Sequence, residues 1–256
     1  MLTATGYFRP RSSWLHRRHP TTKLLTAFWL LAAAFLLPPS ALLALLAAVW
    51  LGAVSCGLLG GLLRSSRVGL YLLVSIVVVN AFFFPGGHDF LLALGPIRLT
   101  REGLEAGLVG GGRILVVLEA LLLFLFTTLA DDLLEALVQR GASARLAFVV
   151  LSAVQMVPRL QAKAAAILDA QQARGLAIGG SIGGRLRALV PLVGPLLLGT
   201  LIDVRERTFA LEARGFGSGL PRTAYRLVAD PPADRALRWL LAAAFVGLIV
   251  VALTIR

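Results

Sequence analysis

Long apolar runs decide what this 256-residue chain can fold into. The runs cover Leu24–Leu37, Ala41–Leu63, Val68–Phe84, Gly103–Ala130 and Trp239–Ile255. Each is close to the roughly 20 residues that an α-helix needs to cross a bilayer. Hydrophobic residues make up 58% of the chain, more than a soluble domain of this size hides from water. We therefore predict an all-α integral membrane protein with about five transmembrane helices, and the composition argues against a soluble enzyme.

The basic residues are unevenly distributed between these runs. The chain has 25 Lys and Arg residues against 13 Asp and Glu residues, a net charge of +12. Most of the basic residues lie in 1–23, 64–67 and 131–238, which alternating spans place on one side of the membrane. Because basic loops tend to stay in the cytoplasm, we expect a multi-pass protein of the cell inner (plasma) membrane with a cytoplasmic N-terminus. Since the charge flanks spans instead of forming one soluble patch, we expect no nucleic-acid partner.

A long basic stretch separates the fourth apolar run from the last one. Apolar residues recur there at intervals of three and four over 146–174 and again over 186–214, which is the period of an amphipathic helix. Pro191 and Pro195 should bend the second helix in its first half. The segment 188–202 is apolar on all sides but short for a span, and we interpret it as a helix lying against the membrane face or beneath the bundle.

These observations predict three domains. Residues 1–130 form an N-terminal membrane domain with four transmembrane helices, and residues 237–256 form the final transmembrane helix. Between them, residues 131–236 form a cytoplasmic domain with two long amphipathic helices.

Both long helices are predicted to end in the same triplet, Ala-Arg-Gly, at 173–175 and 213–215. Glycine commonly ends a helix because it accepts the left-handed conformation, and arginine in the last turn meets the negative end of the helix dipole favourably. That explanation suffices for either triplet alone. Two such triplets on two long helices indicate a pair of arginine tips, and a planar guanidinium suits them to bind carboxylates in an acidic groove of a partner.

These motifs resemble the transmembrane (T) component of energy-coupling factor transporters, which are importers of vitamins and transition metals of the ATP-binding-cassette (ABC) type. The resemblance runs from Trp14 to the last span and rests on Trp14–Leu24, Met156–Leu160 and Ala210–Phe216. The family more often has Asp where this chain has His19, so no role is assigned to that position.

The resemblance implies a non-catalytic subunit whose partners hydrolyse ATP, and it makes residues 131–236 a cytoplasmic coupling domain of two long crossed amphipathic helices and a short one. Two ABC ATPase subunits would each receive one helix tip in a groove, and a separate substrate-binding membrane (S) subunit would topple to release its vitamin or metal ion. The hydrophobic faces of the coupling helices would dock the S subunit, and Asp131–Leu137 would be a short first coupling helix. The sequence does not identify the substrate, because the substrate site of this family lies on another subunit. Carried over by position, the ATPase-coupling residues are Ala173, Arg174, Gly175, Ala213, Arg214 and Gly215.

The chain lacks the features that would let it act alone. It has no Gly-x-x-x-x-Gly-Lys-Ser/Thr loop, so we expect no ATP binding by the chain itself. His16, His19 and His88 do not have the spacing of metal ligands, so we expect no metal site and no cofactor. The main alternative is a polytopic membrane enzyme acting on lipid substrates, but Asp131-Asp132 is the only adjacent acidic pair. A self-sufficient secondary transporter would predict inverted repeats, and none is visible.

Two charged residues, Arg113 and Glu119, lie within the fourth apolar run. Intramembrane charges are candidates for function because they are expensive to bury. The alternative is that Arg113 extends toward the membrane surface while Glu119 is paired or protonated within the bundle. Both interpretations stay open. We expect His88-Asp89 in an extracellular loop.

Overall fold

The computed structural model describes the backbone of residues 8–9, 11, 13–85, 90–94, 97–176, 182–216, 218 and 228–255, and the side chains of all of these except 90–94, 97–98, 182–189 and 255. The expected loop at His88-Asp89 lies outside the described residues. The chain divides into two compact units, of which unit 1 comprises Met1–Gly141 with Val228–Arg256 and unit 2 comprises Ala142–Leu227. The sequence-based domain boundaries at 131 and 236 remain a prediction.

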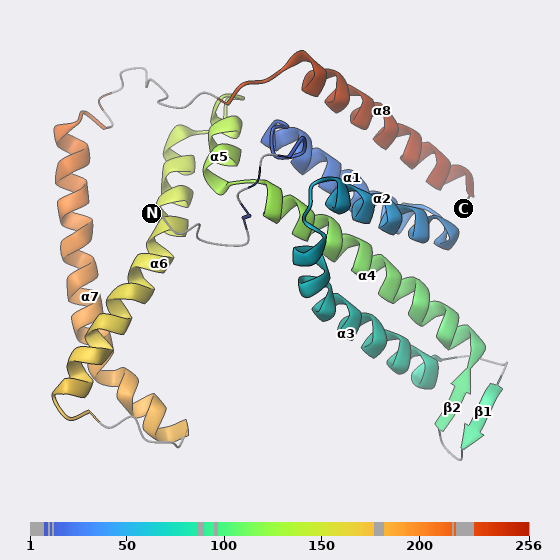
Figure 1. Ribbon diagram of the computed structural model, residues 1–256, viewed down its shortest axis with the longest axis horizontal. Helices are drawn as coiled ribbons and strands as arrows, with labels where there is room; N and C mark the ends of the chain where they lie inside the picture. Colours follow the sequence, from blue (N-terminus) through green and yellow to red (C-terminus); the bar gives the residue numbers. More distant parts are fainter. Residues whose placement is uncertain are drawn as a thin grey trace. The chain divides into compact units, whose positions relative to one another are not determined.

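Unit 1 is a bundle of apolar helices (Figure 1). Its elements are α1 (Pro20–Leu36), the 3-10 turn η1 (Pro39–Ala41), α2 (Leu42–Ser55), α3 (Leu59–Phe83), β1 (Phe90–Leu94), β2 (Ile97–Thr100), α4 (Arg101–Thr127), α5 (Ala130–Val138) and α8 (Pro232–Ile255). Helix α4 packs against α3, α1 and α2, while α1 also packs against α8 and α5. The short antiparallel hairpin β1–β2 follows α3 in the chain and precedes α4; the sequence did not predict it.

Three helices of unit 1 are long and apolar enough to cross a membrane, namely α3, α4 and α8. Two shorter apolar helices, Pro20–Leu36 and Pro39–Ser55, accompany them. Many of their large side chains are exposed, as expected of helices whose solvent is lipid. This confirms an all-α membrane protein, to which the hairpin adds a minor sheet.

A stripe of glycines brings α3 and α4 together. Gly103, Gly107 and Gly111 recur every four residues on α4 and are buried. A Cβ atom at Gly107 would lie 2.8 Å from the Cα atom of Val77 on α3, closer than real Cβ atoms come. Small residues at this spacing let two helix backbones approach in a membrane, where apolar burial gives no driving force between helices.

The boundary predicted between the second and third apolar runs, at residues 64–67, is wrong. Helix α2 ends at Ser55, and α3 runs without interruption through both arginines to Phe83. The chain turns instead at Cys56–Leu58, where Gly57 has φ 67°, a conformation that favours glycine. The flanking residues Cys56 and Leu58 are buried and apolar, so the turn carries no polar signal that would interrupt the apolar run.

Unit 2 consists of α6 (Ala144–Ala173) and α7 (Ile182–Ala213), the two long helices that the apolar period predicted. The helices cross, and α7 changes direction within its first half, which contains Pro191 and Pro195 (Figure 1). Lys163 on α6 donates to a carboxylate oxygen of Asp203 on α7 at 2.9 Å, which fixes where the helices meet. No residue of α6 is classed as buried, so its apolar face is available to another surface.

Candidate coupling site

The tip of α6 is built by the Ala-Arg-Gly triplet. The helix ends at Ala173 and Gly175 takes φ 93°, the left-handed conformation. The amide of Gly175 donates to the carbonyl of Gln172 at 2.9 Å, and that of Leu176 donates to the carbonyl of Gln171 at 3.0 Å. This pair of bonds is the Schellman motif, which satisfies the last carbonyl groups of a helix.

The tip of α7 has the same construction. Gly215 has φ 72°, its amide donates to the carbonyl of Glu212 at 2.9 Å, and the amide of Phe216 donates to the carbonyl of Leu211 at 2.9 Å. The two triplets therefore produce one backbone geometry twice, with the arginine at the equivalent position. The sequence prediction that both helices stop at their glycine is confirmed.

The two tips lie far apart within unit 2. The ring of Phe216, just after the α7 tip, contacts that of Phe148 near the start of α6, with 4.9 Å between ring centroids. Arg174 lies at the other end of α6, about 40 Å from Phe148 along the axis at 1.5 Å per residue. Figure 1 shows the end of α6 and the end of α7 at opposite ends of this unit.

Both arginines are free to meet a partner. Arg174 and Arg214 are exposed together with the alanine and glycine beside each. Within the described part of the chain, neither guanidinium has a hydrogen bond or an ion pair. A fork of donors on a rigid, exposed helix end is suited to bidentate binding of a carboxylate. No group of three or more potential metal ligands occurs among the described residues.

A polar cluster in unit 1, which the sequence analysis missed, joins the start of α1 to the start of α8. The carboxylate of Asp234 is fully buried; it accepts from Arg18 at 3.0 Å and from the amide of His19 at 2.9 Å. Arg238 donates to both oxygens of Asp230, at 2.9 and 2.7 Å. These bonds hold the pKa of Asp230 below its usual value, chiefly through the hydrogen bonds from Arg238.

His19 belongs to this polar cluster and caps α1. Its Nδ1 accepts from the amide of Thr21 at 3.3 Å, the task that Asp performs equally well at an N-cap. Burial is the main cause that lowers the pKa of His19, which keeps the ring neutral and able to accept. Nearby, the buried Lys23 donates to the carbonyl of Thr127 at 2.7 Å and fastens α1 to the end of α4.

The polar cluster also lies beside the two points at which the chain leaves unit 1, after Gly141, and returns to it, at Val228. With its amide oriented to suit both partners, Gln139 donates to the carbonyl of Val228 at 3.2 Å and accepts from its amide at 3.1 Å. Arg140 lies 3.8 Å from Asp230. The signal available from sequence was the family-like segment Trp14–Leu24, whose partners near 230 are too distant in the chain to be inferred.

The two intramembrane charges have different surroundings. Arg113 lies over the ring of Phe35, with 6.0 Å from the guanidinium carbon to the ring centroid. Glu119 is fully buried, and neither of its oxygens has a partner at hydrogen-bonding distance among the described residues, because the neighbouring Ser66 hydroxyl donates to the carbonyl of Leu62 at 2.6 Å. Asp131 and Asp132 occupy the first turn of α5, where acidic residues stabilise a helix N-terminus.

Apolar spanning helices, with a separate pair of long helices ending in matched arginine tips, define a helical membrane protein with a helical coupling part. The family model described as "CbiQ: Cobalt transport protein" matches residues 11–225. The chain therefore belongs to this family and is a transmembrane component of an energy-coupling factor transporter.

Several relatives support the assignment. The chain is 33% identical to the energy-coupling factor transporter transmembrane protein EcfT of Lacticaseibacillus paracasei over 241 residues. This alignment covers 87% of this chain and 88% of that protein. The EcfT protein of Thermanaerovibrio acidaminovorans is 36% identical over 238 residues, 86% of each chain. A longer Bifidobacterium longum protein, named as an ABC transporter ATP-binding protein, is 31% identical over 228 residues, 85% of this chain and 29% of that protein. A membrane enzyme acting on lipids is not favoured.

Proposed function

We propose that this chain is the energy-coupling subunit of an importer, that it docks two ABC ATPase subunits through Arg174 and Arg214, and that it transmits their motion to a separate substrate-binding membrane subunit. The observation that supports this proposal best is the repeated tip: two helix ends with the same Schellman hydrogen bonds, about 40 Å apart at 1.5 Å per helical residue. One tip per ATPase makes equivalent contacts with two copies of one groove. The relative named as an ABC transporter ATP-binding protein supports an ATP-binding partner.

The coupling residues divide the work at each tip. Arg174 and Arg214 would bind carboxylates in the groove, while Ala173 and Ala213 leave room beside them. Gly175 and Gly215 supply the left-handed turn, and no described atom lies within 4 Å of a Cβ atom built at Gly175. The chain itself hydrolyses no ATP in this proposal, so hydrolysis by the purified single chain would contradict it.

The apolar faces of α6 and α7 are suited to dock the substrate-binding subunit. Large apolar side chains are exposed along both helices, including Val149 (61%), Leu198 (65%) and Leu201 (61%). Faces of this kind on a single chain are typical of surfaces buried in an assembly. The substrate, a vitamin or a metal ion, would be bound by that second subunit.

Charge reversal tests the docking. Arg174→Glu and Arg214→Glu, singly and together, should weaken co-purification of the ATPases, because each puts a carboxylate against an acidic groove. Loss of a buried, charge-paired contact of this type weakens binding by roughly 30-fold or more. The matched controls are Arg159→Glu on α6 and Arg205→Glu on α7, both exposed but away from the tips. Unchanged ATPase binding and uptake in the double variant would refute the proposal.

We further propose that unit 2 faces the cytoplasm of a cell whose inner (plasma) membrane holds unit 1. The chain has one cysteine, Cys56, which is buried, so single introduced cysteines report their own exposure. Arg174→Cys should react with a membrane-impermeant maleimide in inverted vesicles, and Ser40→Cys, in the turn before α2, should react in right-side-out vesicles. The opposite pattern would refute this orientation and leave the docking proposal untouched.

A further inference from the structure

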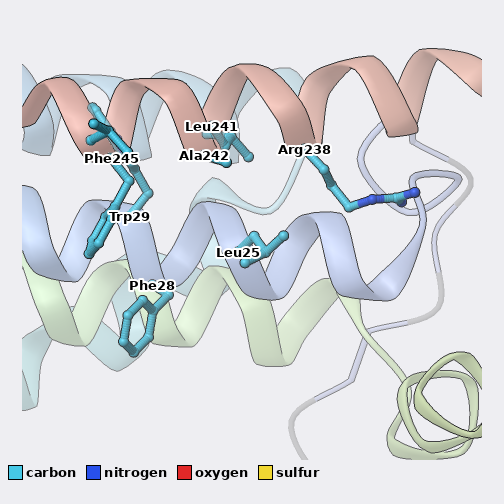
Figure 2. A pocket seen from close by; sticks show the side chains of 8 residues that line it. Leu25, Phe28, Trp29, Arg238, Leu241, Ala242 and Phe245 are labelled. Carbon is cyan, nitrogen blue, oxygen red and sulfur yellow. The ribbon is translucent and has the colours of Figure 1, made fainter. Parts of the chain in front are cut away.

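A narrow apolar groove runs between α1 and α8 in unit 1. It has a volume of about 380 Å³. Leu25, Phe28 and Trp29 line it from α1, and Arg238, Leu241, Ala242, Phe245 and Val246 line it from α8. Figure 2 shows Trp29 beside Phe245 at one end and Arg238 at the other, where α1 begins. The groove is therefore apolar along its length and bounded by a cation at one end.

The dimensions of the groove suit a lipid acyl chain. The lining residues from Arg238 to Val246 span about 12 Å of α8 at 1.5 Å per residue. One leaflet provides about half of the roughly 30 Å hydrocarbon core, so the groove follows most of a leaflet.

The Arg238 end of the groove carries an excess of positive charge. Arg18, Arg140, Arg235 and Arg238 pair with only two carboxylates, Asp230 and Asp234, among the residues that the structure describes. Arg235 is the most exposed of these arginines, with 65% of its side chain accessible, and its one contact with Asp230 is made by Nε at 3.4 Å. At 3.6 residues per turn, Arg235 shares a face of α8 with Ala242 and Val246, which line the groove.

We propose that this groove binds one anionic phospholipid, with an acyl chain between α1 and α8 and its phosphate at Arg235. Charge complementarity selects the headgroup, because the cluster has two guanidiniums more than carboxylates and attracts a lipid with a net negative charge. Arg238 is poorly placed to bind the phosphate, because only 12% of its side chain is exposed and it already donates to both oxygens of Asp230 and to Thr22. Arg235 has no such bidentate bond and keeps donors available.

Tryptophan fluorescence quenching tests this site in the full chain. Trp14→Phe, Trp50→Phe and Trp239→Phe leave Trp29 as the only tryptophan, within the groove. A companion chain keeps only Trp239, which is 77% exposed on α8 and reports the general lipid. Both are reconstituted in phosphatidylcholine vesicles with a small share of phosphatidylglycerol, and either lipid carries bromine on its acyl chains to quench nearby tryptophan.

Brominated phosphatidylglycerol should quench Trp29 as strongly as expected if its share beside Trp29 were about fivefold higher than its share of the membrane. A fivefold preference is about what the attraction of one arginine for an anionic lipid provides. Trp239 should follow the bulk composition. Arg235→Gln should abolish the enrichment, whereas Arg64→Gln, an exposed arginine on α3, should not. Ala242→Phe, which fills the groove, should reduce quenching of Trp29 by either lipid, unlike Ala243→Phe, which is not among the groove-lining residues.

Equal quenching of Trp29 by the two lipids, or an unchanged preference in Arg235→Gln, would overturn the proposal. Selective protection of Trp29 on addition of a substrate-binding subunit would also overturn it, since the groove would then bind protein. If the single-tryptophan chains do not fold, native mass spectrometry of the unmodified chain and of Arg235→Gln compares retained phosphatidylglycerol with retained phosphatidylcholine. Loss of the preference in the variant supports the site, and equal retention refutes it.

Discussion

Replacing Asp234 with Ala is expected to lower the free energy of unfolding of unit 1 by about 3 kcal/mol, a sum of three losses. The buried amide of His19 loses its acceptor, which costs about 1–3 kcal/mol. The ion pair with Arg18 contributes only about 1 kcal/mol, because 35% of the Arg18 side chain is exposed and water replaces part of the interaction. A carboxylate in the first turn of α8 adds about 0.5 kcal/mol through the helix dipole.

Asp234→Asn separates these contributions. The amide oxygen of Asn still accepts from His19, so only the ion pair and the dipole term are lost, about 1.5 kcal/mol. Thermal unfolding of the purified full chain in detergent measures the difference. At about 2–4 °C per kcal/mol for a chain of this size, Asp234→Ala should lower the midpoint by roughly twice as much as Asp234→Asn does.

The chain supplies its own control for the Asp234 prediction. Glu105 pairs with Arg101 at 3.1 Å, but both side chains are about two-thirds exposed, 67% for Arg101 and 65% for Glu105. Glu105→Gln should therefore leave the midpoint almost unchanged, because water screens exposed ion pairs. The reasoning fails if Glu105→Gln destabilises the chain as much as Asp234→Ala, or if Asn and Ala at position 234 are equally destabilising.

Three further predictions concern stability. As pH falls below about 6.5, the free energy of unfolding should fall until the pH passes the lowered pKa of His19, because the unfolded chain takes up the proton before the folded one does. In the folded chain the ring of His19 is surrounded by Asp230, Asp234, Arg140 and Arg238. His19→Asn should reduce this pH dependence in thermal midpoints measured from about pH 7.5 to about pH 5.5, and the dependence that remains is due to His16, whose pKa is also lowered, chiefly by burial. Gly215→Ala should destabilise unit 2 by about 1–2 kcal/mol because of its φ of 72°, whereas Gly194→Ala in the body of α7, with open space around its Cβ position, should stabilise it by up to about 1 kcal/mol; equal signs in thermal unfolding would refute the assignment of the tip. Glu119→Leu should raise the thermal midpoint, because burying a carboxyl without a hydrogen-bond partner in the described structure costs about 1–3 kcal/mol and the substitution removes it. A lowered midpoint would show instead that Glu119 has a stabilising partner.

The parts of the fold that sequence predicted are those with a local cause. The α6 and α7 tips depend on glycine at the left-handed position and on the carbonyls three and four residues before it, so the triplets at 173–175 and 213–215 were sufficient to predict them. The long apolar period likewise predicted both helices of unit 2. The turn at Gly57 was missed for the converse reason, because its neighbours are buried and apolar and resemble a continuing span.

The polar cluster could not be predicted because its causes are distant in the chain. Arg18 and Asp234 meet across 216 positions, and nothing near either residue specifies the other. The hairpin β1–β2 was missed because its strands are only 5 and 4 residues long, too short for an alternating pattern to stand out beside helices of more than 20 residues.

The polar cluster and the groove have one physical explanation. Apolar faces of α1 and α8 gain little by packing together in lipid, because lipid tails are as apolar as the side chains they would replace. Hydrogen bonds at one end, donated by Arg18 and His19 to Asp234 and by Arg238 to Thr22, therefore determine where α8 lies against α1. Since those bonds hold the helices, the apolar seam beyond them need not close. An apolar groove beside arginines that outnumber the carboxylates suits a lipid with an anionic headgroup. Substitutions that remove the hydrogen bonds of Asp234 should therefore also reduce the preference of brominated phosphatidylglycerol over brominated phosphatidylcholine in quenching Trp29.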